Sequence, residues 1–221
     1  MRFSHLIKIL ILVTIALGLL NIISCSSSLE AGTDTNNTNQ SITAQTIEEF
    51  PIEDLSEEEI FGLIFMREEE KLARDVYITL NEIWNRRVFS NISVSEQRHM
   101  DALKTLINRY ELDDPVGENS LGVFKNETLQ NLYNTLIEQG NGSLIEALNV
   151  GALIEEIDII DIQNELDENV DNRDINFVYQ NLLNGSYNHL RAFVRNHSRQ
   201  GIEYEPQKLS VEQYLAIISA E

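Results

Sequence analysis

Glutamate and histidine recur three positions apart within a segment that otherwise follows the apolar pattern of a helix. Glu96 and His99 interrupt the apolar series that begins at Ile92 and ends at Tyr110. Residues three apart on a helix lie on one face, so we expect both side chains to face the same partner. A carboxylate buried among apolar side chains costs on the order of several kcal/mol unless it is paired, protonated or bound to a metal ion. This pair could therefore ligate a metal ion from one helix.

Similar polar interruptions occur in three other apolar helical patterns. The candidate metal ligands on the four helices are Glu70, Glu96, His99, Glu155, Asp158 and His189. One polar residue in such a pattern is usually a hydrogen-bonded core residue, but this set would place four negative charges in one core. Two divalent cations would neutralise those charges. A mixed carboxylate and imidazole donor set suits iron or manganese, and zinc is compatible with it, so we expect a di-iron or di-manganese centre.

Four long helices are needed to position these residues. Apolar residues at steps of three and four predict long helices over residues 56–86, 92–110, 143–168 and 172–197, and short ones over 126–138 and 210–219. Short turns join the first long helix to the second and the third to the fourth, whereas a much longer segment joins the second to the third. A long connection can cross a bundle, which is the ferritin-type connection. We therefore expect an all-α, ferritin-like four-helix bundle with a long crossover between helices 2 and 3 and short extra helices.

The candidate ligands lie in stretches that resemble known motifs. Residues 70–77 (Glu-Lys-Leu-Ala-Arg-Asp-Val-Tyr) are similar to the first-helix Glu-x-x-Ala-x-x-x-Tyr of rubrerythrin-like proteins. Residues 96–99 match the second-helix Glu-x-x-His of that family, and residues 155–158 resemble its third-helix pair of carboxylates. Residues 186–189 keep the fourth-helix histidine but have Ser186 where the family has glutamate. The resemblance implies a di-metal site that lacks one carboxylate.

A wider resemblance covers residues 55–219, which are similar to an uncharacterised prokaryotic domain family of the ferritin-like superfamily. The stretches that carry it are residues 67–77, 95–100, 151–156 and 188–193. This resemblance implies the fold of nearly the whole domain, but it implies no activity because the family has no assigned reaction. Within such a domain, either Asp158 replaces the donor missing at Ser186 or one of the two metal positions is weak.

The N-terminus has the features of an export signal. Residues 1–24 combine a basic start with a long apolar run, and the sequence Ile-Ile-Ser-Cys at residues 22–25 resembles the lipobox of prokaryotic lipoproteins. We expect a signal peptide over residues 1–24, a lipidated Cys25 that begins a Ser/Thr/Asn-rich tether over residues 25–50, and a ferritin-like domain over residues 51–221. The protein would then be anchored to the cell membrane or outer membrane and face outside the cytoplasm. The alternative is an uncleaved membrane anchor, because the apolar run is nearly long enough to span a bilayer.

The charge and the cysteine content limit the function. The formal net charge is −20, which disfavours nucleic acid as a partner and favours cations, although an acidic surface also serves solubility alone. Cys25 is the only cysteine of the chain. A disulfide within the chain and a cysteine-rich metal site are therefore excluded. Any bound metal must use oxygen and nitrogen ligands.

Several other charged residues lie close to the candidate ligands. Glu68 and Glu69 belong to a run of acidic residues, and Glu156 lies outside the apolar pattern of its helix, so we expect all three to be solvated. Arg67 lies near an apolar face. It could pair with a carboxylate of the metal site or cover the end of the bundle.

Three functions fit this sequence. The first is a redox protein whose di-metal centre acts on oxygen, peroxide or ferrous iron and receives electrons from its substrate or from an unidentified redox partner. The second is a metal-binding protein without turnover, and the third is a metal-free structural or interaction domain at the membrane surface. In the third case the buried carboxylates would pair with Arg67, Arg98 or Arg191. A homodimer is compatible with all three, and whether the protein is an enzyme stays open.

Overall fold

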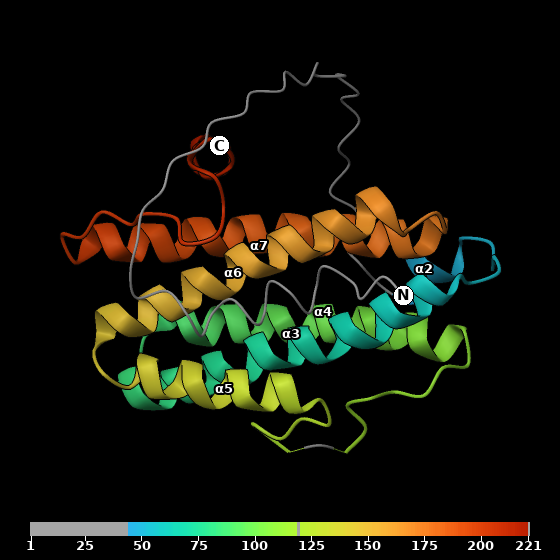
Figure 1. Ribbon diagram of the computed structural model, residues 1–221, viewed down its shortest axis with the longest axis horizontal. Coiled ribbons are helices and arrows are strands. Elements are labelled where there is room, and N and C mark those ends of the chain that lie inside the picture. Colours follow the sequence, from blue (N-terminus) through green and yellow to red (C-terminus); the bar gives the residue numbers. More distant parts are fainter. Residues whose placement is uncertain (1–43, 119, 221) are drawn as a thin grey trace. The chain divides into compact units, whose positions relative to one another are not determined.

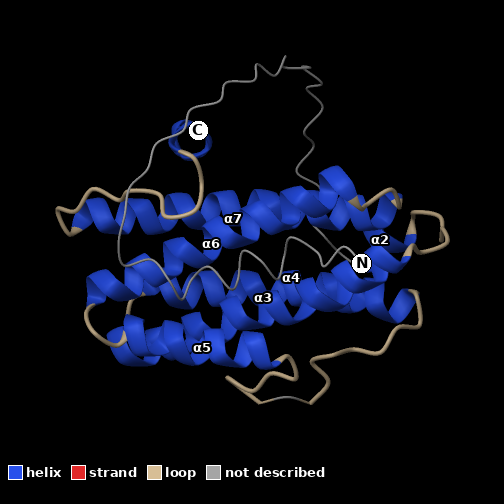
Figure 2. Cartoon of the chain, in the orientation of Figure 1, coloured by secondary structure: helices blue, strands red, loops and turns tan. Residues whose placement is uncertain are grey.

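The computed structural model describes residues 44–118 and 120–220, and these residues form helices and loops without a β-strand (Figure 2). The four long helices are α3 (Glu57–Trp84), α4 (Arg87–Arg109), α6 (Leu144–Glu168) and α7 (Arg173–Arg199). The shorter helices are α2 (Ala44–Glu48), α5 (Glu127–Gly140) and α8 (Val211–Ser219). The predicted all-α fold class is confirmed for the described part of the chain.

The long helices form two antiparallel pairs that enclose one core. Helix α3 packs along α4, and α6 packs along α7, so that the pairs form two layers (Figure 1). The layers meet where α3 contacts α6 and where α4 contacts α7. Helices α4 and α6 are therefore diagonal to each other. The connection between them must cross the bundle, and it includes α5, which packs against both α3 and α6.

Local sequence signals explain where α3 begins and ends. Ser56 caps its N-terminus, because the Ser56 hydroxyl accepts the Glu59 amide at 3.0 Å while the Glu59 carboxylate accepts the Ser56 amide at 2.9 Å. Asn85 ends the helix in the left-handed conformation with φ 46°, which asparagine tolerates better than most residues. Helix α4 begins at Arg87, five residues before the predicted start at residue 92.

The folded part also begins earlier than predicted. Residues 44–48, which we expected in the tether, form α2, and Ile47 is buried where α2 contacts α4 and α7. Phe50 makes two further contacts with the bundle. Its carbonyl accepts a hydrogen bond from Arg109, and its ring centroid lies 5.2 Å from that of Phe177. Residues before 51 thus pack against the bundle, since Ile47 is buried and Phe50 is half-buried.

The predicted signal peptide, the predicted lipidation site at Cys25 and most of the predicted tether lie outside the described residues. Among the helices of residues 44–118 and 120–220, none combines the length and the apolar character needed to cross a bilayer.

Two of the acidic residues that we expected at the surface are structural hydrogen-bond acceptors in the interior. Glu68 accepts the backbone amide of Lys125 at 3.0 Å, just before α5. Glu156 accepts the backbone amides of residues 207–209 and the hydroxyl of Tyr204, and it thereby fixes the segment that leads to α8. Both predictions of solvation were wrong because tertiary partners cover these side chains.

Three aromatic rings fill the core beside the candidate ligands. Tyr77, Phe89 and Phe193 come from three different long helices, and their ring centroids lie 5.4 to 6.4 Å apart. Gly151 leaves room for this cluster, since a Cβ there would lie 2.3 Å from the Phe193 ring. The cluster lies beside the candidate ligands, because the Tyr77 hydroxyl donates a hydrogen bond to Glu155.

Candidate metal centre

Five of the six predicted ligands meet in the middle of the bundle. They are Glu70 of α3, Glu96 and His99 of α4, Glu155 of α6 and His189 of α7. All five are buried. The apolar pattern of each helix turns its ligand toward the core, and the two helix pairs then bring the four faces together.

Glu96 is the central residue of this group. Its Oε2 lies 2.8 Å from His99 Nδ1, and its Oε1 lies 2.8 Å from His189 Nδ1. The two imidazole rings lie nearly parallel, with centroids 5.6 Å apart. One carboxylate therefore connects two histidines on the neighbouring helices α4 and α7, which belong to different helix pairs.

A further carboxylate faces each histidine on its outer side. Glu70 Oε2 lies 3.1 Å from His99 Nδ1, and Glu155 Oε2 lies 3.3 Å from His189 Nδ1. The result is two triads of ligand atoms that share Glu96: Glu70, Glu96 and His99 in one, and Glu96, Glu155 and His189 in the other. Within each triad the ligand atoms lie within 4.8 Å of one another. Each triad offers one nitrogen and two oxygens, a donor set that suits iron, manganese or zinc.

Several of these atoms are close together without forming a hydrogen bond. Glu96 Oε1 and His189 Nδ1 lie 2.8 Å apart, yet both are buried without a hydrogen-bond partner, as is Glu155 Oε2. An unsatisfied buried polar atom is expensive unless an ion or water occupies the space that it faces. The unsatisfied atoms of Glu96, Glu155 and His189 therefore have the arrangement expected of ligand atoms around one metal ion.

Burial and mutual charge shift the pKa values of all five residues. Burial alone would lower the pKa of His99, but the carboxylates of Glu70 and Glu96 outweigh it and raise this pKa to about 10. The pKa of His189 is likewise raised by Glu96 and Glu155 against the effect of burial.

Among the carboxylates, burial raises the pKa of Glu70 to about 7, partly offset by His99, and it raises the pKa of Glu155 in the same way. Burial would also raise the pKa of Glu96, but the two imidazolium groups outweigh it and hold this pKa far below its usual range. The metal-free centre therefore favours protonated histidines around an ionised Glu96. Protons then occupy the positions where metal ions would neutralise the same charges.

Asp158 and Ser186 do not complete the triads. Asp158 is buried one turn from Glu155, and burial together with the charge of Glu69 raises its pKa well above the usual range. Its carboxylate nevertheless belongs to neither triad. The Ser186 hydroxyl donates to the Leu182 carbonyl of its own helix at 3.2 Å. Position 186 thus has a short side chain that is bonded to its own helix and offers no carboxylate to the triads.

Two residues that support the centre did not stand out as such in the sequence. The Tyr77 hydroxyl donates to Glu155 Oε1 at 2.5 Å and lies 3.2 Å from the Gly151 carbonyl, so it orients Glu155. A Cβ at Gly185 would lie 2.6 Å from Cε1 and Nε2 of His99, so only glycine leaves room for that ring. The available signal was a glycine inside a helix, which costs about 1 kcal/mol relative to alanine and calls for a reason.

The arginines that could have neutralised the carboxylates are engaged elsewhere. Arg67 donates to Asp114 at 3.1 Å and to the Met100 carbonyl at 2.9 Å, which joins α3 to the crossover. Arg191 donates to the Ile217 carbonyl at 2.7 Å, and Arg98 is exposed. None of the three forms an ion pair with a ligand of the centre.

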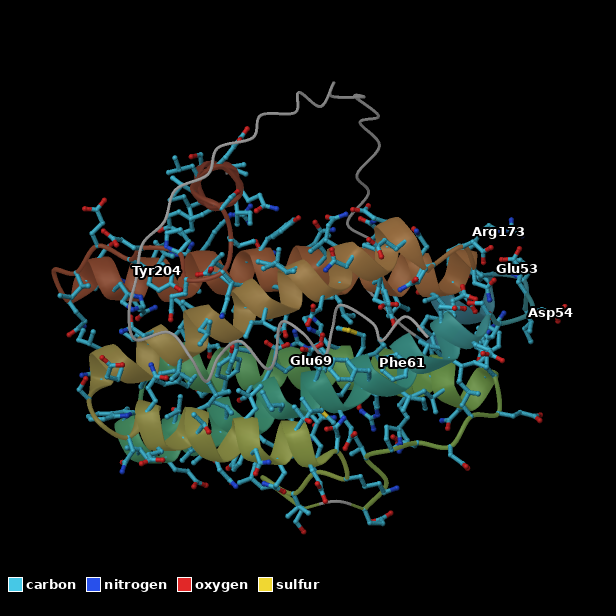
Figure 3. All side chains as sticks on the ribbon, viewed as in Figure 1. Glu53, Asp54, Phe61, Glu69, Arg173 and Tyr204 are labelled. Carbon is cyan, nitrogen blue, oxygen red and sulfur yellow. The ribbon has the colours of Figure 1, made fainter. Side chains whose placement is uncertain are left out.

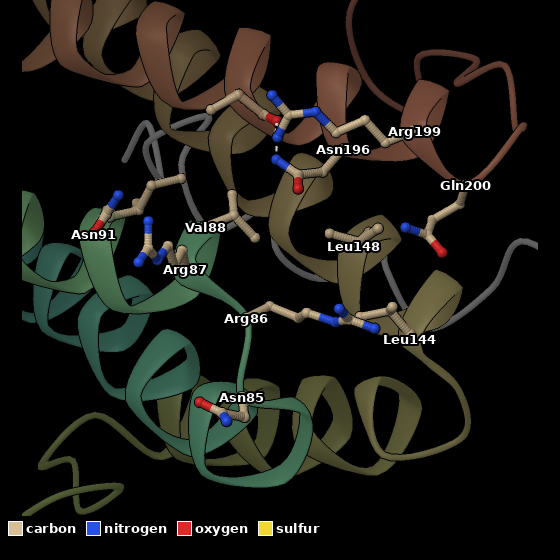
Figure 4. A pocket seen from close by; sticks show the side chains of 12 residues that line it. Asn85, Arg86, Arg87, Val88, Asn91, Leu144, Leu148, Asn196, Arg199 and Gln200 are labelled. Atoms are coloured by element: carbon tan, nitrogen blue, oxygen red, sulfur yellow. Dashed lines mark hydrogen bonds between the residues drawn. The ribbon is translucent and has the colours of Figure 1, made fainter.

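A surface cavity of about 540 Å³ lies at the end of the bundle where α3 turns into α4 (Figure 4). Arg86, Arg87 and Arg199 line it together with asparagine and aliphatic side chains. None of the six predicted ligands lines this cavity, so it does not open onto the centre.

Comparisons with known proteins agree with the fold. A family model described as an uncharacterized protein domain, DUF2202, matches residues 59–221. The chain is 51% identical over 174 residues to the uncharacterized protein MJ0754 of Methanocaldococcus jannaschii, and the match covers 79% of this chain and 94% of that protein. It is also similar to the crystal structure of hypothetical protein MJ0754, with a TM-score of 0.75 over 77% of this chain and 97% of that chain. The predicted resemblance to an uncharacterised domain family is confirmed, and these descriptions name no activity.

Proposed function

This chain belongs to the uncharacterized DUF2202 domain family, and we propose that it binds two iron or manganese ions in a ferritin-like carboxylate and histidine centre. One ion would be held by Glu70, Glu96 and His99, and the other by Glu96, Glu155 and His189, with Glu96 shared. Zinc is compatible with the same donors.

The observation that carries this proposal is the pair of atoms Glu96 Oε1 and His189 Nδ1. They lie 2.8 Å apart from two different helices, both are buried, and neither has a hydrogen-bond partner. If the centre served only to join the helices, the ring would be expected to donate a well-aligned hydrogen bond to the carboxylate. A cation between these two atoms would satisfy both of them.

The surrounding residues would prepare the site for redox chemistry. Iron or manganese would supply a change of oxidation state, and oxygen, peroxide or ferrous iron are the proposed reactants. Burial of the ligands keeps bulk water away, and Tyr77 holds Glu155 in a fixed orientation. The described chain contains no cysteine ligand for an electron-transfer group, so electrons would come from the substrate or from a separate redox partner.

Metal binding without turnover is the second candidate, and Ser186 is the observation that favours it. The missing carboxylate leaves each ion with few protein ligands, which suits exchangeable binding. In a metal-free structural role, the third candidate, His99 and His189 would have to neutralise the buried carboxylates, because Arg67, Arg98 and Arg191 bond elsewhere or are exposed.

We also propose that the protein acts outside the cytoplasm. The lipobox-like sequence before Cys25 supports an exported protein anchored by lipid to the cell membrane or outer membrane. The metal centre would then face outside the cytoplasm on a domain tethered to the membrane surface.

The test is a metal count. The full chain is loaded anaerobically with ferrous iron or Mn²⁺, desalted and subjected to elemental analysis beside His99→Ala and His189→Ala. Two ions retained by the wild type, with one or both lost in each variant, would support the centre. A folded wild-type protein that retains no ion would refute it. Repeated turnover with oxygen or peroxide would then separate a redox enzyme from a binding protein.

A further inference from the structure

A second group of buried acidic residues lies next to the metal centre, toward the start of α3. Glu69 of α3 faces Asp161 and Glu165 of α6 across the interface between these helices. All three side chains are buried, with 3%, 0% and 2% of their surface exposed. Figure 3 shows Glu69 in the middle of the bundle, whereas Glu53, Asp54 and Arg173 lie at its end. The predicted solvation of Glu69 is wrong, because α6 covers this side chain.

These carboxylates lack the donors that other buried acids of this chain receive. Glu59, Glu68 and Glu156 all accept backbone amides. In contrast, both oxygens of Glu69, both oxygens of Asp161 and Oε2 of Glu165 have no hydrogen-bond partner. The described residues thus leave buried carboxylates unsatisfied at two places: the metal centre and this group.

Something must neutralise the charge of this group. Three buried carboxylates without a cation would repel one another in a medium of low dielectric constant. The group therefore holds either shared protons or a cation.

The unsatisfied oxygens of the group are the observation that favours a cation. Gly62 of α3 lies opposite Glu165, and a Cβ there would be 2.7 Å from Glu165 Oε2 and 3.3 Å from the Tyr179 hydroxyl. The missing side chain at Gly62 leaves room for the Glu165 carboxylate between α3 and α6. The three carboxylates are spaced more widely than the ligands of the two triads, which suits an ion that keeps part of its water shell.

We propose that Glu69, Asp161 and Glu165 form a second cation site, separate from the di-metal centre, that takes a hard divalent ion such as Mn²⁺. The site offers only oxygen ligands, which hard cations prefer, whereas the imidazoles of the centre suit iron and zinc. The Asn169 amide donates to Glu165 Oε1 at 3.0 Å and keeps Oε2 directed to the interior. This site does not depend on whether the centre is catalytic or on whether it is loaded.

The test counts Mn²⁺ bound at equilibrium, with free Mn²⁺ measured by electron paramagnetic resonance. Four full-length proteins are titrated: the wild type, Glu69→Gln with Asp161→Asn, His99→Ala with His189→Ala, and Glu68→Gln as the control. Glu68 is the matched control because it is a buried glutamate on the same helix that already has a donor. Circular dichroism confirms that each variant is folded, and Glu165→Gln replaces the double acidic variant if that variant does not fold.

We expect three ions in the wild type and in Glu68→Gln, two in the double acidic variant, and one in the double histidine variant. The ion left in the histidine variant should bind at least tenfold more weakly once Glu165→Gln is added. The site is refuted if the acidic variants bind as many ions as the wild type. A wild type with one ion that the acidic variants lose would refute the centre and leave the site standing, so the two proposals fail separately.

Discussion

Gly185 lies directly against the imidazole ring of His99, so that a Cβ at position 185 would be 2.6 Å from Cε1 and Nε2 of that ring. The glycine belongs to α7 and the histidine to α4. The position of the His99 ring, a candidate ligand, therefore depends on the close approach of these two helices.

Gly185→Ala should therefore displace His99. Alanine is the better helix former by about 1 kcal/mol, so the metal-free protein should keep most of its stability while the site of Glu70, Glu96 and His99 loses its ion. Elemental analysis after anaerobic loading would measure the loss, with the neighbouring exposed residue as control in Asn184→Ala. Full metal retention by Gly185→Ala would show that the ring has room to move.

Tyr77→Phe should weaken the other position. The change removes the hydrogen bond to Glu155 Oε1 but keeps the ring among Phe89 and Phe193. Loss of such an orienting partner typically lowers metal affinity about 10- to 100-fold, and competition with a chelator would measure it. Tyr133→Phe, which removes a hydroxyl bonded to Thr79 on the outer side of the bundle, should leave the affinity unchanged. Equal effects in both variants would contradict an orienting role for Tyr77.

Ser186→Glu should strengthen metal binding. A glutamate here would stand one turn before His189 and add a carboxylate on the same face of α7. In the metal-free protein the same change adds a buried charge and should lower the melting temperature. Thermal unfolding with and without Mn²⁺ would show both effects, and Ser186→Gln controls for size. A variant that Mn²⁺ stabilises no more than it stabilises Ser186→Gln would mean that the new carboxylate does not reach the ion.

The stability of the metal-free protein should fall as the pH rises. The folded-state pKa values of Glu70 and Asp161 are raised from 4.5 and 3.8 to about 7, mainly by burial. The pKa of His99 is raised from 6.5 to about 10, because the carboxylates outweigh burial. A group with a raised folded-state pKa binds its proton more tightly in the folded protein, so its stabilisation is present at low pH and is lost through that interval.

Melting temperatures of the chelator-treated protein should thus decrease from about pH 5 to about pH 9. Below about pH 4.5 the opposite trend should appear, since the pKa of Glu96 is lowered in the folded state and its stabilisation is lost on protonation. Bound metal ions replace these protons, so the metal-loaded protein should lack the alkaline decline. A melting temperature of the metal-free protein that rises between pH 5 and pH 7 would contradict the assignment.

Ile47→Ala should destabilise the protein although the residue lies outside the predicted domain. Ile47 is fully buried where α2 contacts α4 and α7, and removing a buried isoleucine costs about 2–5 kcal/mol. Ile52 is a nearby isoleucine with 66% of its surface exposed, so Ile52→Ala should change stability little. Urea unfolding of both variants would compare them. Equal stabilities would mean that α2 does not belong to the folded unit.

The sequence by itself determined the helices and five of the buried polar side chains that meet between them. Apolar residues at steps of three and four define the buried face of each helix, and a polar residue within such a face must be buried wherever that helix packs. The spacing of Glu96 and His99 was therefore enough to predict that both face the core. The same reasoning could not show that Asp158 is left out of both triads, because that depends on how far α6 is rotated against α3.

The tertiary structure decided which helix faces are covered. Helix α3 packs against α4, α5 and α6, so it has almost no face left for solvent along its middle. That is why Glu68 and Glu69 are buried, although their place in a run of acidic residues predicted that they would be solvated. The close contact of Gly185 with His99 and the second acidic group of Glu69, Asp161 and Glu165 also arise only where two helices meet. Periodicity describes one helix at a time, whereas these features depend on the rotation and separation of neighbouring helices.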